Sequence, residues 1–128
     1  MAHEPSTSIT YENVLEKLVE YVPEVKEAYE AELKWWGAER PGPHVVYGDV
    51  LNPYIDRLLQ AGDQTALRRV FSLLEVLSSS EDVRVQEVVA VTVCEHLGSD
   101  QQKLAQAKRF MGRATLKISD DVEKFWKK

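Results

Sequence analysis

The residues with reactive side chains are few and form no catalytic or metal-binding motif. Cys94 and His96 are two positions apart, and on a helix such side chains point about 200° apart, so they cannot act together as nucleophile and base. The other histidines, His3 and His44, belong to no His-x3-His or Cys-x2-Cys pair, and no glycine-rich phosphate loop is present. The sequence therefore predicts no catalytic residue, no bound metal and no cofactor.

The stretch VVYGDVLNPY, residues 45–54, carries the polar groups that best fit an alternative function. A small enzyme or ligand-binding protein would use a cleft lined by His44, Asp49, Asn52 and Tyr54, with Glu87 or Glu95. The competing interpretation is a joint in a helix, because Pro53 has no N–H and the residue before a proline is biased out of the helical conformation. Asn52 would then cap the segment that begins at Pro53.

Glutamates recur at helical spacing near the start of the chain, as Glu12, Glu16, Glu20, Glu24, Glu27 and Glu30. Like charges four residues apart destabilise a helix by about 0.2–0.5 kcal/mol per pair, and Lys17 and Lys26 offset only part of this. The face is either simply solvated or a docking surface for a cationic partner. Trp35 and Trp36 follow it at adjacent positions about 100° apart, so one should pack and the other lie near the loop RPGPH, where it either packs or contributes to an interface.

The composition is that of a globular protein with one domain. The chain has 128 residues, 44% of them hydrophobic and 29% charged. We expect a flexible tail over residues 1–9 and a helical domain over 10–128. The opening MAHEPSTS lacks the regions of a signal peptide, and the single Cys94 excludes an internal disulfide. No apolar run approaches the roughly 18 residues of a membrane span, so a cytoplasmic protein without membrane partners is expected.

The charge is unevenly distributed along the chain. The net charge is -5, and residues 1–64 hold 12 acidic and 5 basic side chains. This balance argues against nucleic acid as a partner, because phosphate neutralisation requires a basic surface. It suits a basic protein partner through complementary charge.

Apolar periodicity predicts about seven helices. They cover residues 10–22, 23–36, 44–61 with an interruption near Pro53, 64–77, 81–97, 101–111 and 115–126. Gly62 should close the third and Asp63 cap the fourth, which would bury Leu67, Val70, Phe71, Leu74 and Leu77. Ser99 and Gln102 have capping-box spacing. The last helix would bury Leu116, Val122 and either Phe125 or Trp126.

The valine-rich segment 81–97 is ambiguous, because its valines also alternate as in a strand. Its length, its serine-acid start and the absence of a partner strand favour a helix. Glu75, Glu87 and Glu95 lie on the two most apolar helices, and we expect them to pair with Arg68, Arg69 or Arg84. Hairpins of residues 11–22 with 23–36, and 64–77 with 81–97, would give a HEAT- or armadillo-like array, with a compact orthogonal bundle as the alternative.

Four short blocks in order suggest a relationship: VYGDVLNPYIDRLL, FSLLEVLSSSEDVRVQEVVAVTVCEHL, AKRFMG and EKFW. Together they resemble a family of small, poorly characterised bacterial helical proteins discussed among the immunity proteins of polymorphic toxin systems. The resemblance spans roughly residues 11–126. It implies a cytoplasmic protein that binds and neutralises a cognate toxin, and it carries over no functional residue.

The leading hypothesis is a non-enzymatic protein-binding module whose glutamate face, with Trp35 or Trp36, contacts a basic toxin domain. The protein would be a monomer or a homodimer, the latter built through the valine-rich helix or through Phe125 and Trp126.

Overall fold

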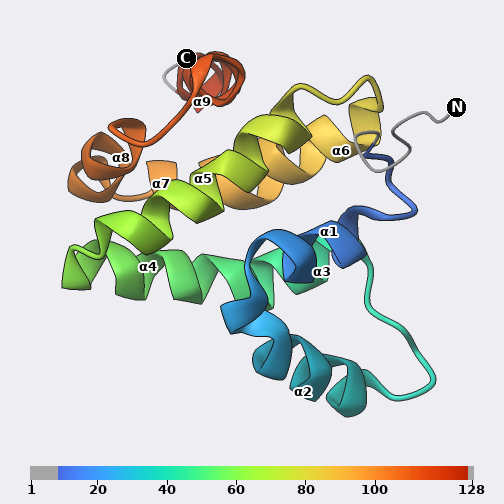
Figure 1. The fold of residues 1–128 in the computed structure, drawn as a ribbon. Coiled ribbons are helices and arrows are strands. Elements are labelled where there is room, and N and C mark those ends of the chain that lie inside the picture. Colours follow the sequence, from blue (N-terminus) through green and yellow to red (C-terminus); the bar gives the residue numbers. More distant parts are fainter. Residues whose placement is uncertain (1–8, 127–128) are drawn as a thin grey trace, which may run out of the picture.

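The computed structural model describes residues 9–126, and the predicted tail at residues 1–9 lies almost wholly outside this range. The described chain is all-helical and contains no strand, as predicted (Figure 1). The described residues form seven helices. A short 3-10 turn, η2, leads into the second helix, and π-helical segments, η3 and η4, lie within the third and fifth. The elements in order are α1 (Val14–Tyr21); η2 (Pro23–Val25) with α2 (Lys26–Trp36); α3 (Pro43–Val46), η3 (Tyr47–Leu51) and α4 (Asn52–Ala61); α5 (Gln64–Ser78); α6 (Val83–Glu87), η4 (Val88–Cys94) and α7 (Glu95–Gly98); α8 (Gln101–Lys108); and α9 (Arg113–Trp126).

Helix α5 forms the centre of the molecule and packs against α1, α4, α6 and α9. Its apolar side chains recur every three or four residues and are buried as predicted, in a set that comprises Leu67, Val70, Phe71, Leu74 and Leu77. Phe71 stacks on Phe110, with ring centroids 6.2 Å apart, and this contact joins α5 to the segment after α8. The core therefore surrounds one helix instead of separating into paired repeats.

The junction between α4 and α5 confirms the predicted glycine stop and aspartate cap. Gly62 has a left-handed conformation with φ 69°, which favours glycine. Asp63 Oδ1 then accepts a hydrogen bond from Ala66 N at 3.1 Å. The capping box at Ser99 and Gln102 is wrong, because Asp100 Oδ1 caps α8 instead. It accepts from Gln102 N at 3.0 Å, whereas the Ser99 hydroxyl bonds back to His96 O.

The predicted break at Asn52–Pro53 is wrong, because α3, η3 and α4 form one continuous helix. Asn52 has helical backbone angles, φ -58° and ψ -46°. Its N–H donates to the carbonyl of Tyr47, five residues earlier, so the chain enters Pro53 through a wider π turn. This turn accommodates the missing N–H of proline without ending the helix.

The valine-rich segment is also one helix, which confirms the helical interpretation of residues 81–97. Its middle, η4, is a second π-helical segment, and it packs directly against η3. Two of the valines that gave the strand-like alternation, Val83 and Val91, are exposed rather than buried. The buried set follows the helix faces that meet α5 and η3.

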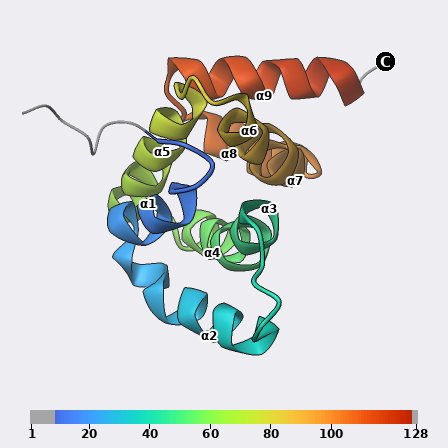
Figure 2. The same cartoon turned by 90° about the vertical axis from the view of Figure 1, so that its right-hand side faces the viewer.

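Helices α2 and α9 each depart from an expectation. α2 packs against η3, so residues 11–22 and 23–36 do not form the predicted hairpin. Phe125 on α9 is 67% exposed and does not enter the core, while the side chain of Trp126 lies outside the described part. In both views α2 and α9 lie at opposite ends of the molecule (Figures 1 and 2).

Candidate functional site

The predicted glutamate face is divided between two helices that do not continue each other. Helix α1 ends at Tyr21, and the turn at Pro23–Val25 redirects the chain into α2. Half of the glutamates are paired within the chain: Glu12 with Arg84 at 3.3 Å, Glu20 with Lys17 at 2.9 Å, and Glu24 with Arg69. Their charge is therefore partly neutralised before any partner binds.

The other three glutamates keep their charge available. Glu16, Glu27 and Glu30 are exposed, and they take part in none of the ion pairs found among residues 9–126. Glu27 and Glu30 both lie on α2, whose side chains are all exposed or half-buried. Of the six predicted glutamates, those without an ion pair in the described chain are thus two on α2 and one in the first turn of α1, and α2 also carries the exposed Lys26 and Lys34.

The two tryptophans at the end of α2 have different environments. Trp35 is 78% exposed, whereas Trp36 is half-buried and donates from Nε1 to Glu32 Oε2 at 3.0 Å. The two rings form an edge-to-face pair with centroids 5.2 Å apart. One tryptophan of the pair is thus partly packed, as expected, while Trp35 is accessible and does not pack on the following loop.

Asp49, a residue of the predicted cleft, faces α2. It is exposed on η3, and its carboxyl shares a hydrogen bond with Glu32 that, together with burial, raises the pKa of Glu32. The bond from Trp36 acts in the opposite direction and lowers that pKa. Asp49 and Glu32 thus form a close carboxyl pair where α2 meets η3.

His44 and Asn52 both bond to Thr92, across the contact between η3 and η4. His44 Nδ1 lies 2.7 Å from Thr92 Oγ1, and Asn52 Nδ2 donates to Thr92 O at 3.1 Å. Asn52 is buried, and its Oδ1 has no protein partner. Gly48 lies against the same threonine, because a Cβ there would stand 3.5 Å from Thr92 Cγ2, an ordinary van der Waals distance. The arrangement joins two helices.

The predicted cleft is not assembled from these residues. His44 and Asn52 meet at Thr92, Asp49 faces Glu32, and the Tyr54 ring lies 5.7 Å from the guanidinium carbon of Arg57. Glu87 lies beside α9, where it lines a groove together with Glu95. The candidates are thus distributed over four different surroundings and share no single site.

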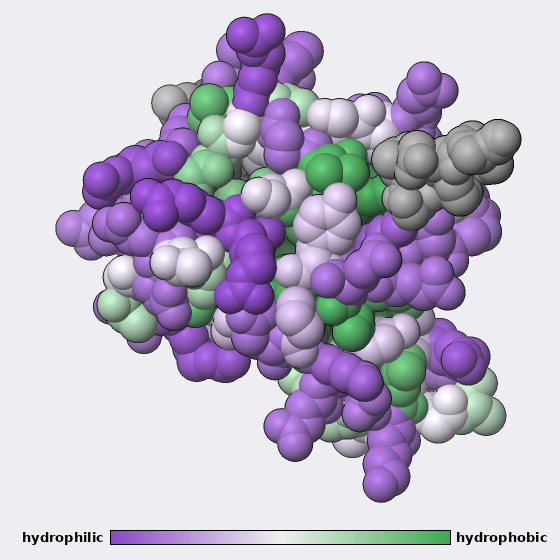
Figure 3. Space-filling model, viewed as in Figure 1, coloured by the Kyte–Doolittle hydropathy of each residue, from purple (hydrophilic) through white to green (hydrophobic). Residues whose placement is uncertain are grey.

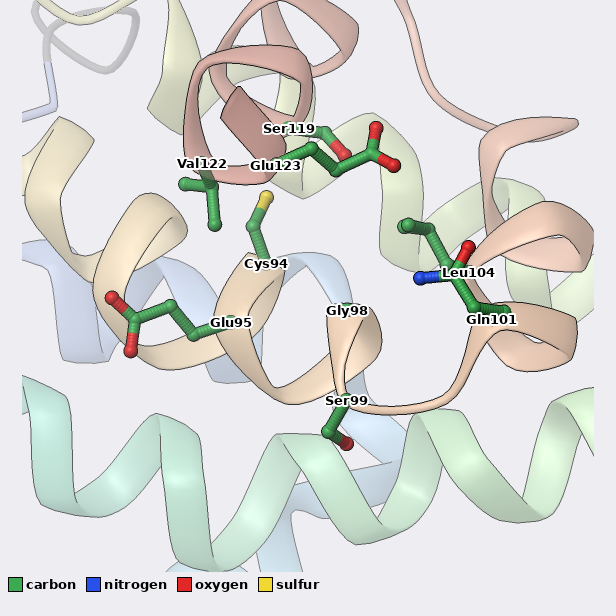
Figure 4. A pocket seen from close by; sticks show the side chains of 9 residues that line it. All are labelled: Cys94, Glu95, Gly98, Ser99, Gln101, Leu104, Ser119, Val122 and Glu123. Carbon is green, nitrogen blue, oxygen red and sulfur yellow. The ribbon is translucent and has the colours of Figure 1, made fainter. Parts of the chain in front are cut away.

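Cys94 and His96 point to different neighbours, as expected for residues two apart. The Cys94 thiol is buried under α9, and burial raises its pKa to about 12, so it stays protonated. It lines a pocket of about 350 Å³, with its sulfur directed toward α9 between Val122 and Ser119 (Figure 4). His96 Nε2 instead bonds to Asp56 at 3.0 Å, and Lys103 Nζ bonds the same carboxylate at 3.0 Å.

Glu75 has a structural role that the sequence did not suggest. Instead of pairing with an arginine, its carboxylate accepts hydrogen bonds at the start of α9 from Ala114 N at 2.9 Å, Thr115 N at 3.0 Å and Thr115 Oγ1 at 2.9 Å. Burial raises the pKa of Glu75, but these bonds outweigh it, so the pKa lies below its usual value. Since Glu75 is 39 residues from Ala114, no local motif could reveal this cap.

The described residues contain neither a metal-ligand cluster nor a membrane-spanning helix. No group of three or more His, Cys, Asp or Glu side chains there is placed to hold a metal ion. Among the same residues, no helix has the length and apolar character required to cross a bilayer.

These features describe a small all-helical protein whose surface carries exposed acidic and aromatic side chains. The chain belongs to the family described as a domain of unknown function (DUF7674), whose model matches residues 15–127. Searches of curated proteins and of solved structures found no match.

Proposed function

We propose that this protein is a non-enzymatic module that binds another protein through α2 and the first turn of α1, here called the α2 surface (Glu16, Glu27, Glu30 and Trp35). The observation that carries the proposal is the exposure of α2. None of its 11 residues is buried, and Trp35 is 78% exposed at its end. Tryptophan is among the residues that contribute most binding energy when an interface buries it.

The glutamates of the α2 surface favour a basic partner, although the exposed Lys26 and Lys34 on the same helix offset part of their charge. In Figure 3 the lobe at the lower right, where Figure 1 places α2, is mostly hydrophilic with small apolar patches. Its exposed glutamates attract a basic protein over a distance of about one Debye length, roughly 8 Å at physiological ionic strength. Charge complementarity of this kind raises the association rate and selects against acidic partners.

The more specific proposal is an immunity protein that acts in the bacterial cytoplasm. It rests on the resemblance of the sequence blocks to proteins discussed in that role and on the fit between the α2 surface and a cationic toxin domain. Such a protein would work by occupying the toxin, so it would require no catalytic group of its own.

The test begins with capture of the partner from a native lysate by the purified protein. Two variants remove the proposed contacts: Trp35→Ala, and the pair Glu27→Lys with Glu30→Lys. The matched control is Glu81→Lys, at a glutamate that is also exposed but precedes α6 and lies outside the α2 surface. We expect both variants to lose capture and the control to retain it, with binding of the wild-type protein weakened by salt.

The toxicity of the captured protein then tests the proposed immunity function. If the protein is an immunity protein, expression of the captured partner alone stops growth, and co-expression with wild type but not with Trp35→Ala restores it. A captured partner that is harmless would refute the immunity function and leave the binding module standing. Unchanged capture by both variants would refute the α2 surface itself.

A further inference from the structure

A second surface, at the other end of the molecule, is an open apolar groove between α9 and the helix α6–η4–α7. We call it the α9 groove. It has a volume of about 300 Å³, and its walls hold Val83, Gln86, Glu87, Ala90, Val91, Glu95, Ile118, Asp121, Val122 and Phe125. It is independent of the α2 surface, because α2 lies at the opposite end in both views (Figures 1 and 2).

Each wall of the α9 groove is a continuous helix face. On α9 the lining positions 118, 121, 122 and 125 are spaced i, i+3, i+4 and i+7. On the other wall, positions 83, 87, 90 and 91 follow the same kind of spacing. Two such faces that meet along an open side leave room for a third helix against both of them.

The apolar side chains of the α9 groove are exposed to a degree that packing within the chain does not explain. Val83 is 63% exposed and Val91 51% exposed, although both stand on a helix whose opposite face forms the core. Apolar side chains gathered in one place with a polar rim mark interaction sites more often than scattered ones do. They represent apolar area that a partner could remove from water.

The rim of the α9 groove is acidic. Glu87 and Glu95 line one wall and Asp121 the other, and none of the ten lining residues is cationic. Asp121 pairs with Lys117, at 3.6 Å and largely exposed, whereas Glu87 and Glu95 join no ion pair among residues 9–126. An occupant with lysine or arginine beside its apolar face would satisfy this rim.

We propose that the α9 groove binds an amphipathic helix of a partner protein, with apolar residues at i, i+3 or i+4, and i+7 flanked by lysine or arginine. The charge argues against a second copy of the chain, because a two-fold symmetric contact would set the acidic rim of one copy against that of the other.

The probe is a fluorescein-labelled synthetic 18-residue peptide with leucine at those apolar positions and lysine beside them. A second peptide has glutamate in place of every lysine. Binding to the full chain is measured by fluorescence anisotropy, and amide shifts in NMR spectra locate the bound peptide. We expect the lysine peptide to bind at least tenfold more tightly than the glutamate peptide, with shifts in residues 83–95 and 118–125.

Two variants test the walls and the rim of the α9 groove separately. Val83→Ser with Val91→Ser removes exposed apolar area without touching the core, and should weaken binding about tenfold. Glu87→Lys with Glu95→Lys should weaken it by a similar factor at low salt, and the effect should fade as salt is added. The control Val45→Ser, at a residue that is 37% exposed and outside the groove, should bind as wild type does.

Three results would overturn the proposal. The first is equal binding of the two peptides, and the second is binding that survives both groove variants. The third is wild-type dimerisation, seen in sedimentation, that Val83→Ser with Val91→Ser abolishes, since this would assign the groove to a second copy. Reversal of Glu27 and Glu30 on the α2 surface should leave peptide binding unchanged, so failure of the α2 surface would be distinguishable from failure of the groove.

Discussion

Glu75 caps helix α9, and this cap predicts how substitutions at Glu75 and at the neighbouring Gly112 change the free energy of unfolding. Glu75→Ala removes an acceptor of three hydrogen bonds, two of them from backbone N–H groups of the first turn of α9. Losing a helix cap costs about 0.5–2 kcal/mol, and hydrogen bonds to a charged group contribute about 1.5–3 kcal/mol. Because the bonds share one carboxylate and water can replace part of them, we expect the free energy of unfolding to fall by about 2–3 kcal/mol.

Gly112→Ala should disturb the same cap, because Gly112 lies against the side chain of Glu75. A Cβ at Gly112 would stand 2.5 Å from both Cδ and Oε1 of Glu75, whereas carbon atoms in contact lie about 3.5–4.0 Å apart. The carboxylate must therefore move by about 1 Å, which disrupts its bonds to α9. We expect a loss of about 1–2 kcal/mol in the wild-type background and almost none when Glu75 is already alanine.

The assay is urea unfolding followed by circular dichroism for wild type, both single variants and the double variant. A coupling of about 1–2 kcal/mol between the two substitutions is expected. Gly98→Ala is the matched control, because a Cβ there meets nothing within 4 Å, and it should be neutral or slightly stabilising. Strict additivity of the two substitutions would refute the reasoning.

The same cap has a defined pH dependence. Because the pKa of Glu75 is lowered in the folded protein, its contribution is fully present above the unfolded value near 4.5 and is lost as the pH falls through the lower folded value. The stability difference between wild type and Glu75→Gln should therefore be largest at pH 7 and shrink below about pH 4. A difference that stayed constant between pH 7 and pH 3 would show that the charge of Glu75 contributes nothing.

Three further predictions concern other groups. Tyr47→Phe removes the buried bond from the tyrosine hydroxyl to Val14 O, 2.9 Å long, and should lower the unfolding free energy by about 1–3 kcal/mol in the same urea assay. Cys94, whose pKa burial raises to about 12, should react with a thiol reagent at pH 8 only in urea, and fast labelling of the native protein would contradict its burial. Bonds from Arg84 and Tyr11 lower the pKa of Asp82 to about 2, so Asp82→Asn should lower the urea midpoint much more at pH 7 than at pH 2, and an equal loss at both pH values would contradict this.

The sequence was sufficient for features that depend on neighbouring residues. The buried face of α5, the glycine stop at Gly62 and the cap at Asp63 all follow from local spacing, and the structure confirms them. The helical character of residues 81–97 followed from their length and flanking residues. Each of these inferences uses contacts within about one helical turn.

The sequence was insufficient where residues far apart in the chain meet. Asn52 resembled a cap beside Pro53, but its amide bonds to Thr92, 40 residues away. Glu75 resembled an ion-pair partner, but it caps α9. The predicted cleft failed for the same reason, because shared position in the sequence does not establish which helix each side chain faces.

The two π-helical segments bear on how the chain tolerates changes of length. In each, a backbone N–H bonds to the carbonyl five residues earlier, from Asn52 to Tyr47 and from Glu95 to Ala90, so each turn holds one residue more than an α-turn. Deleting Gly48 or Ala90 can therefore restore an α-turn while the flanking segments keep their orientation. Helix α5 contains no π-turn, so deleting a residue within it would rotate the chain that follows by about 100° about the helix axis. Circular dichroism of the three deletion variants should show folded protein for the first two and loss of structure for the third.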